Sequence, residues 1–239
     1  MKKTIIVMPV ANEESTMASI IDEILALPYD NLSLYPVIDN YSHDNTQSII
    51  RSYEHTGRVK CIFHEKSTGV ISCYLYGYRQ ALADGAEYVI EMDGGRSHLP
   101  SEIPQFIDKL DEGYDIVWGS RFIKGGSITN APLYRRILSY GGTILANIVL
   151  GTRLKDMTSG FEAFTREVLE SLDLDKILST GHMYQTELKF YCRKFNAAVV
   201  PINYTAGSSS LKGSSVTEAL RLLFIIRKNE PNVHINKPI

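Results

Sequence analysis

The segment TIIVMPV at residues 4–10 is a run of apolar, largely β-branched side chains that ends shortly before the polar Asn12 and Glu13. Runs of the same kind recur at 32–38, 59–63, 88–92 and 115–118. Between them, apolar residues repeat every three or four positions, which is the spacing of an amphipathic helix. Strands that alternate with helices are typical of a mainly parallel sheet. We therefore predict an α/β fold in which helices flank a mainly parallel central sheet.

The pattern changes after residue 119. A glycine-bearing loop to residue 132 precedes a weakly polar helix, and a second loop is expected at 151–160. The elements predicted beyond it are a short helix near residue 168, a helix at 183–195, a strand at 197–202, a Ser/Gly loop and a final helix at 216–227. Because the sequence has no repeat and no long linker, we predict one domain over residues 1–239. It divides into halves at 1–118 and 119–213 and a C-terminal helix and tail at 214–239.

The composition excludes several classes of protein. With 25 Lys and Arg against 27 Asp and Glu in 239 residues, the net charge of −2 argues against a nucleic-acid binder. Cys61, Cys73 and Cys192 form no CxxC pair, which argues against a disulfide framework and a thiolate zinc site. No run reaches the roughly 20 apolar residues of a membrane span. We therefore expect a cytoplasmic protein that is soluble or peripheral at the cytoplasmic face of a membrane.

Three carboxylates follow predicted strands at the edge where α/β sheets bind ligands. Glu13 follows the first strand, Asp39 ends the second and Asp93 ends the fourth. Asp44 is better explained as the cap of the next helix. The motifs GxGxxG, GxxxxGK followed by Ser or Thr, HExxH and GxSxG are all absent. The dehydrogenase, P-loop, zinc-protease and serine-hydrolase interpretations therefore lose their main support.

Five motifs in a fixed order carry a resemblance. They are Met8-Pro9-Val10-Ala11-Asn12-Glu13, VIDNYSHDNT at 37–46, Glu91-Met92-Asp93, Gly119-Ser120-Arg121-Phe122 and DMTSGF at 156–161. In this order the chain resembles family 2 glycosyltransferases of the GT-A fold. Within that family it looks most like dolichol-phosphate mannose synthases and related polyprenyl-phosphate glycosyltransferases. The resemblance covers roughly residues 4–213, and five motifs in register are specific although each alone is modest.

The resemblance implies a role for each matching position. Pro9, Ala11, Glu13 and Asp39 match positions that bind the nucleotide sugar, so residues 1–118 form its half of the domain. Asp93 matches the first Asp of the family's DxD, which binds the donor through Mn²⁺ or Mg²⁺. Residues that match contacts to the acceptor and donor phosphates lie in the acceptor-facing half, 119–213, namely Arg121, Arg135 and Ser139. Gln185, Glu187, Asp156 and Lys212 are second-rank candidates.

The sequence also departs from the family pattern. The DxD reads Asp93-Gly94-Gly95, so the second metal-binding carboxylate is missing and the metal is expected to bind weakly, with Ser97 or His98 as candidates to complete its site. Ala11 stands where the family has tyrosine, and Asn40 replaces a second aspartate. Ser208-Ser209-Ser210-Leu211 replaces the family's Glu-Ser-Lys-Leu, with Lys212 just beyond.

The function implied is inverting transfer of a sugar from a GDP-mannose-like or UDP-sugar donor to a polyprenyl or dolichyl phosphate. A phosphate acceptor is already an anionic nucleophile, so it needs no general base. One alternative is a glycan hydroxyl acceptor in surface-polysaccharide assembly, with Asp156 or Glu187 as the base. A second is a nucleotide-binding pseudoenzyme, because the DxD is degenerate. The basic Arg221, Arg227 and Lys228 beside apolar residues of the last helix suggest peripheral membrane contact.

Overall fold

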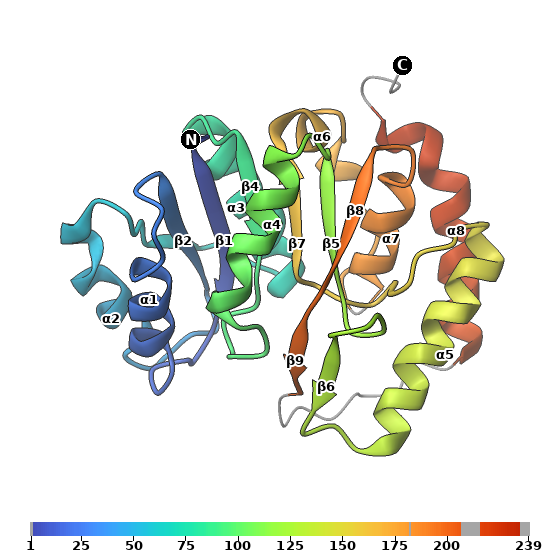
Figure 1. The fold of residues 1–239 in the computed structure, drawn as a ribbon, viewed down its shortest axis with the longest axis horizontal. Coiled ribbons are helices and arrows are strands. Elements are labelled where there is room, and N and C mark those ends of the chain that lie inside the picture. Colours follow the sequence, from blue (N-terminus) through green and yellow to red (C-terminus); the bar gives the residue numbers. More distant parts are fainter. Residues whose placement is uncertain (1, 182, 207–215, 235–239) are drawn as a thin grey trace.

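The computed structural model describes residues 2–181, 183–206 and 216–234. Its centre is a seven-stranded sheet in the order β3-β2-β1-β4-β7-β5-β8 (Figure 1). The strands are β1 Thr4–Val10, β2 Leu32–Asp39, β3 Ile62–His64, β4 Tyr88–Glu91, β5 Ile116–Ser120, β7 Glu162–Thr165 and β8 Ala197–Pro201. Only β7 runs antiparallel to its neighbours, β4 and β5. The predicted α/β fold with a mainly parallel sheet is thus confirmed.

Helices cover both faces of this sheet (Figure 1). The α-helices are α1 Met17–Leu25, α2 Thr46–Ser52, α3 Val70–Ala83, α4 Ile103–Asp111, α5 Leu133–Leu150, α6 Arg166–Glu170, α7 Tyr184–Tyr191 and α8 Val216–Val233. Three short 3₁₀ helices, Glu54–Thr56, Pro100–Glu102 and Leu174–Lys176, lie between them. Helices α5 and α8 pack on each other at one flank of the molecule.

The sheet has a hydrophobic core on each face, and successive side chains of β1 point alternately into one core and the other. Ile5 and Val7 point to the face covered by α3, α7 and α8, whereas Ile6 and Met8 point to the face covered by α1 and α4. All four side chains are fully buried, as expected for a central parallel strand. Helix α3 approaches the sheet closely at Gly77, where a Cβ would overlap the Val7 side chain.

Three strands were not predicted from the sequence. A short parallel pair, β6 Ser127–Thr129 and β9 Asn203–Thr205, lies beyond the main sheet inside segments predicted as loops. The third is β7, whose four residues include the charged Glu162 although all but the last residue are buried. Other bounds shift: β3 begins at Ile62, α7 ends at Tyr191 and α8 continues to Val233.

Candidate active site

The loops after β1 and β2 are cross-linked into one rim at the carboxyl edge of the sheet. The Asn12 backbone N–H donates to Ser42 Oγ (3.1 Å), and Asn12 Oδ1 accepts the His43 N–H (2.9 Å). Asn12 has a left-handed backbone, φ 56°, which asparagine tolerates better than most residues. The Glu13 N–H donates to Thr46 Oγ1 (2.8 Å). The rim is therefore ordered by its own hydrogen bonds before any ligand arrives.

Residues expected to bind the nucleotide sugar lie on this rim. Pro9 is buried near the end of β1, Ala11 is exposed and Glu13 is half-buried. Asp39 ends β2 and is largely buried, and its Oδ1 accepts the Tyr41 N–H (3.1 Å). Asp44 links the two loops, since its carboxylate accepts N–H groups of Glu14 and Thr46. Asn45 occupies the N-cap position of α2 without a side-chain cap hydrogen bond, and Asp44, one residue earlier, caps this turn by accepting the N–H of Thr46, the first helical residue.

Asp93 follows β4 and keeps 38% of its side chain exposed. Its Oδ1 accepts the Tyr74 hydroxyl (2.7 Å), and its backbone N–H donates to His98 Nδ1 (3.2 Å). The other candidate at this end, Ser97, uses its carbonyl to accept the Thr205 N–H (3.0 Å). The structure thus brings Asp93 and His98 together and ties the following segment to β9.

His98 is buried with its ring stacked on Phe161, centroids 4.7 Å apart. Burial lowers the pKa of His98, so the imidazole is neutral at neutral pH. Because Nδ1 accepts from the Asp93 N–H, the ring proton belongs on Nε2, which is buried and has no hydrogen-bond partner among the described residues. His98 therefore holds the backbone of Asp93 in place through Nδ1.

Arg121 follows β5 directly, and hydrogen bonds to neighbouring side chains hold its guanidinium in a cluster. Its Nε donates to Asp156 Oδ2 (2.8 Å) and its Nη2 to Asp156 Oδ1 (2.7 Å), a bidentate pair with side chains only 7% and 1% exposed. Nη2 also lies within hydrogen-bond distance of Ser139 Oγ (3.1 Å) and Thr158 Oγ1 (2.6 Å). Nη1 has no hydrogen-bond partner in the described part of the chain. The cluster fixes the guanidinium and leaves donor capacity for an anion.

Asp156 is the counter-charge of this cluster. Burial alone would raise its pKa, but the hydrogen bonds and positive charge of Arg121 lower it below its usual value. Its Oδ1 also accepts the Thr158 N–H (3.1 Å). Ser139 reaches the cluster from α5, one turn after Arg135, which lies half-buried in the first turn of that helix. The structure therefore brings Arg121, Ser139 and Asp156 together, while Arg135 lies on the same helix as Ser139.

The remaining second-rank candidates lie in different places. Gln185 Nε2 donates to Glu91 Oε1 (2.6 Å) beneath the carboxyl edge of β4. Glu187 is fully buried, and its carboxylate accepts the N–H groups of Leu178 (2.9 Å) and Ser179 (2.7 Å) and the Tyr191 hydroxyl (2.9 Å). That carboxylate organises the segment before α7. Lys212 and Ser208–Ser210 lie outside the described residues.

A buried charge network under the site was missed from sequence. Glu91 and Glu162 are cross-strand partners on β4 and β7, and Lys189 of α7 forms an ion pair with Glu162 and donates to Ser159 O (2.6 Å). All three side chains are fully buried. Burial and the neighbouring Glu162 raise the pKa of Glu91. Lys189 carries one positive charge, so the charges of the network balance only if one of the two carboxyl groups, Glu91, is protonated. The available signal was a charged residue, Glu91, at the end of an otherwise apolar run that forms a buried strand.

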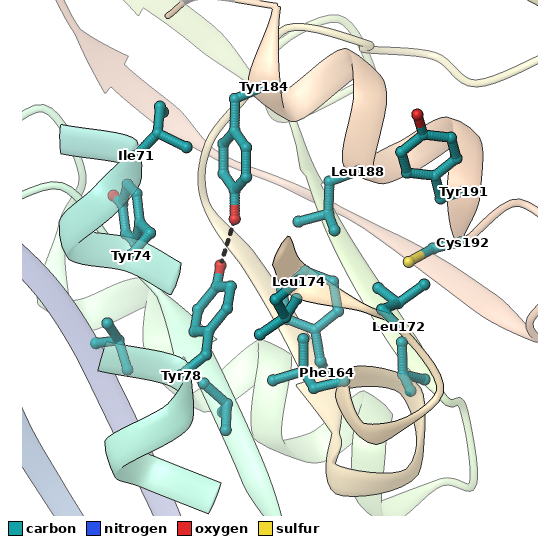
Figure 2. Packing of buried hydrophobic residues seen from close by; sticks show 14 of the residues in the cluster. Ile71, Tyr74, Tyr78, Phe164, Leu172, Leu174, Tyr184, Leu188, Tyr191 and Cys192 are labelled. Carbon is teal, nitrogen blue, oxygen red and sulfur yellow. Dashed lines mark hydrogen bonds between the residues drawn. The ribbon is translucent and has the colours of Figure 1, made fainter. Parts of the chain in front are cut away.

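Tyrosines connect this network to Asp93. Tyr78 donates to Glu91. The Tyr184 hydroxyl donates to that of Tyr78 (3.3 Å), as Figure 2 shows. Tyr74, one helical turn before Tyr78 on α3, bonds Asp93 and stacks near Tyr184 with centroids 6.1 Å apart. All three tyrosines are fully buried, and Tyr74 also supports the site.

Comparisons with known proteins show the family of the chain. The family model of glycosyl transferase family 2 matches residues 5–173. Polyprenol monophosphomannose synthase of Mycolicibacterium smegmatis is 30% identical over 227 residues, covering 92% of this chain and 84% of the relative. Undecaprenyl-phosphate mannosyltransferase of Micrococcus luteus is 30% identical and covers 77% and 78%. Dolichol-phosphate mannosyltransferase of Pyrococcus furiosus is 30% identical over 97% of this chain, which spans 65% of that relative.

Solved structures share the fold at lower identity. Glucosyl-3-phosphoglycerate synthase from Mycobacterium tuberculosis in complex with UDP gives a TM-score of 0.64 at 19% identity, over 97% of this chain and 81% of that one. The same enzyme has also been solved with Mn²⁺, UDP and glucosyl-3-phosphoglycerate. These neighbours establish the GT-A fold. With a family match over more than half its length and relatives 30% identical across at least three quarters of it, the chain is a glycosyltransferase and belongs to glycosyl transferase family 2.

Proposed function

We propose that this glycosyltransferase moves a sugar from a nucleoside-diphosphate donor to the phosphate of a polyprenyl lipid. The names of the three relatives all specify a polyprenol- or dolichol-type acceptor. The observation that carries the proposal is the Arg121 cluster, in which Asp156 and Ser139 fix a buried guanidinium and leave Nη1 for an anion. Arginine binds phosphate with a planar fork of donors and stays charged at any physiological pH.

The donor would lie on the rim formed by the loops after β1 and β2, with its diphosphate toward Asp93. Asp93 is an oxygen ligand of the kind that Mg²⁺ and Mn²⁺ prefer, and it sits where the chain leaves β4. No group of three or more His, Cys, Asp or Glu within residues 2–181, 183–206 and 216–234 could hold a metal alone. The residues therefore fit an ion that the donor phosphates help to coordinate. When bound, the ion would offset charge on the leaving nucleoside diphosphate.

The acceptor chemistry follows from the charges at Arg121. A phosphate oxygen carries its own negative charge, so the chain has to orient it and does not have to remove a proton. Asp156 is held ionised by Arg121, and both oxygens of Glu187 are occupied by structural hydrogen bonds. Neither carboxylate is free to act as the base that a hydroxyl acceptor would need. This disfavours the alternative of a glycan hydroxyl acceptor.

The preserved cluster also disfavours the pseudoenzyme alternative. A buried cation such as Arg121 is costly to desolvate, and it is stabilised here by a bidentate carboxylate and two hydroxyls. A chain that only bound nucleotides on the β1–β2 rim would have no use for this arrangement at the end of β5.

A lipid acceptor also fits the outward face of α5. Leu133, Ile137, Tyr140, Ile144 and Ile148 recur along one side of this helix and are 46–73% exposed. Phe224 and Ile225 of α8, the helix that packs on α5, are also exposed. Among the described helices, none has the length and hydropathy needed to cross a bilayer. We infer a peripheral contact in which this face meets the membrane while Ser139 of the same helix faces the phosphate.

The test is a transfer assay with a panel of GDP- and UDP-sugars and a short-chain polyprenyl phosphate. Arg121→Lys keeps the charge but loses the fork, so kcat/KM for the lipid phosphate should fall by about 100-fold or more. Arg79→Lys, in an exposed ion pair with Asp175, is the matched control and should behave as wild type. Equal activities for Arg121→Lys and the control would refute the assigned role.

A further inference from the structure

The position of the missing DxD carboxylate is occupied from another loop. A Cβ built on Gly95 would lie 3.1 Å from Oε1 of Glu13. The next nearest atoms are Cδ and Oε2 of the same carboxylate, at 3.8 and 4.0 Å. The space into which a side chain at residue 95 would project is therefore filled by the Glu13 carboxylate. Aspartate at 95 would place its own oxygens within this same volume.

The two loops are held against each other at this point. A Cβ on Gly94 would lie 2.6 Å from Val10 Cγ1 and 2.9 Å from the Pro9 carbonyl oxygen. These distances are too short for a side chain, so the segment after Asp93 packs directly on the end of β1. The chain leaving β1 then brings Glu13 beside Gly95.

Glu13 is oriented before any ligand binds. Its backbone N–H donates to Thr46 Oγ1 (2.8 Å), and its Oε2 accepts the Thr16 hydroxyl (3.1 Å). Oε1, the atom nearest Gly95, has no hydrogen-bond donor among the described residues. One carboxylate oxygen is thus fixed and the other is left for a ligand.

We propose that Glu13 supplies the second carboxylate of the divalent-ion site, replacing the residue that glycine vacates at 95. Asp93 and Glu13, one from each loop, then form a pair of hard oxygen ligands. Mg²⁺ is commonly bound by one or two carboxylates together with substrate phosphates and water, and Mn²⁺ accepts the same ligands. This inference rests on the proposed function, and it moves Glu13 from a nucleoside contact to a metal-binding role.

The test measures binding by the full chain, not turnover. Titration calorimetry would follow UDP and GDP with Mn²⁺ or with EDTA, and uridine and guanosine alone. Electron paramagnetic resonance of Mn²⁺ would report bound ion directly. Glu13→Gln should weaken Mn²⁺-dependent binding of the diphosphate by roughly 10- to 100-fold and leave nucleoside affinity nearly unchanged. Glu112→Gln, an exposed carboxylate at the C-terminal end of α4 that pairs with Lys109, is the control and should match wild type.

Moving the carboxylate from position 13 to position 95 makes the test specific. Gly95→Asp in the wild-type background would set a second carboxylate against Glu13, so it should lower the melting temperature in EDTA without improving affinity. The double variant Glu13→Gln with Gly95→Asp should recover Mn²⁺-dependent binding. A merely structural Glu13 would not be rescued in this way.

The possible outcomes distinguish a failure of the metal-binding role of Glu13 from a failure of the proposed transferase function. If Glu13→Gln weakens nucleoside and diphosphate binding equally, or if EDTA leaves wild-type diphosphate binding unchanged, the metal-binding role is overturned while the transferase function stands. If wild type binds no nucleoside diphosphate with any metal, the proposed function fails and the inference falls with it.

Discussion

Asp156→Asn tests whether the Arg121 cluster is a buried ion pair whose loss is costly. Asparagine keeps the size of the side chain but removes the charge from a partner that is 1% exposed, leaving a 7%-exposed guanidinium without its counter-charge. Breaking such a pair typically costs about 3–5 kcal/mol. Because asparagine still offers one acceptor oxygen, we expect about 3 kcal/mol less free energy of unfolding at pH 7.

The control is an Arg–Asp ion pair at the surface, held by a single hydrogen bond. Arg79 and Asp175 also approach to 2.7 Å, but their side chains are 42% and 84% exposed. Asp175→Asn should therefore cost less than about 1 kcal/mol. Urea unfolding followed by circular dichroism measures both variants, with a slope that must stay constant for the comparison to hold.

The pH dependence of the free energy of unfolding tests the same ion pair independently. The folded-state pKa of Asp156 is lowered, so its contribution to stability is complete above the ordinary pKa of 3.8 and is lost as pH falls through the lowered value. The gap between wild type and Asp156→Asn should shrink in strongly acidic buffer. Equal losses for Asp156→Asn and Asp175→Asn at pH 7, or a gap independent of pH, would refute the reasoning.

Three further perturbations test other parts of the structure. Lys189→Met leaves Glu162 buried without its cation. The fold raises the pKa of Glu162 to about 7 beside Lys189 and would raise it further without Lys189, so the loss of unfolding free energy should grow as pH rises above about 7, where only wild type can ionise the folded carboxyl; equal losses at pH 5 and pH 8 would contradict this. Gly77→Ala should lower unfolding free energy by about 1–3 kcal/mol, because its Cβ overlaps Val7, and an unchanged urea midpoint would contradict the close packing. Ile148→Glu should reduce sedimentation with anionic phospholipid vesicles without changing the melting temperature, and unchanged sedimentation would remove α5 from the membrane contact.

The sequence predicted the strands that carry the donor rim because each is a continuous apolar run bounded by polar residues. Strand β7 was not predicted because it has only four residues and contains Glu162, a charged residue that a sequence pattern places in solvent. Its burial depends on Lys189, 27 positions later, and on Glu91 across the sheet. A strand stabilised by a distant cation has no local signature.

Some of the site residues, but not all, could likewise be predicted from the sequence. Arg121 and Ser139 are recognisable from motifs, and the structure brings them to one cluster with Asp156. Tyr74 could not be assigned to the site from the sequence, since nothing in its helix shows that its hydroxyl reaches Asp93. The relation between Gly95 and Glu13 spans 82 positions and depends on how tightly the segment after β4 packs on the end of β1.

The central claim is that the acceptor is a lipid phosphate, and comparison of two acceptors tests it most directly. Full-chain enzyme would be incubated with each labelled GDP- or UDP-sugar and either a polyprenyl phosphate or the corresponding polyprenol, and label in the lipid extract would be counted. We predict labelled lipid with the phosphate and none with the alcohol, because Arg121 offers donors to an anion and neither Asp156 nor Glu187 can serve as a base. Label on the alcohol, or none on the phosphate with every donor, would contradict the account.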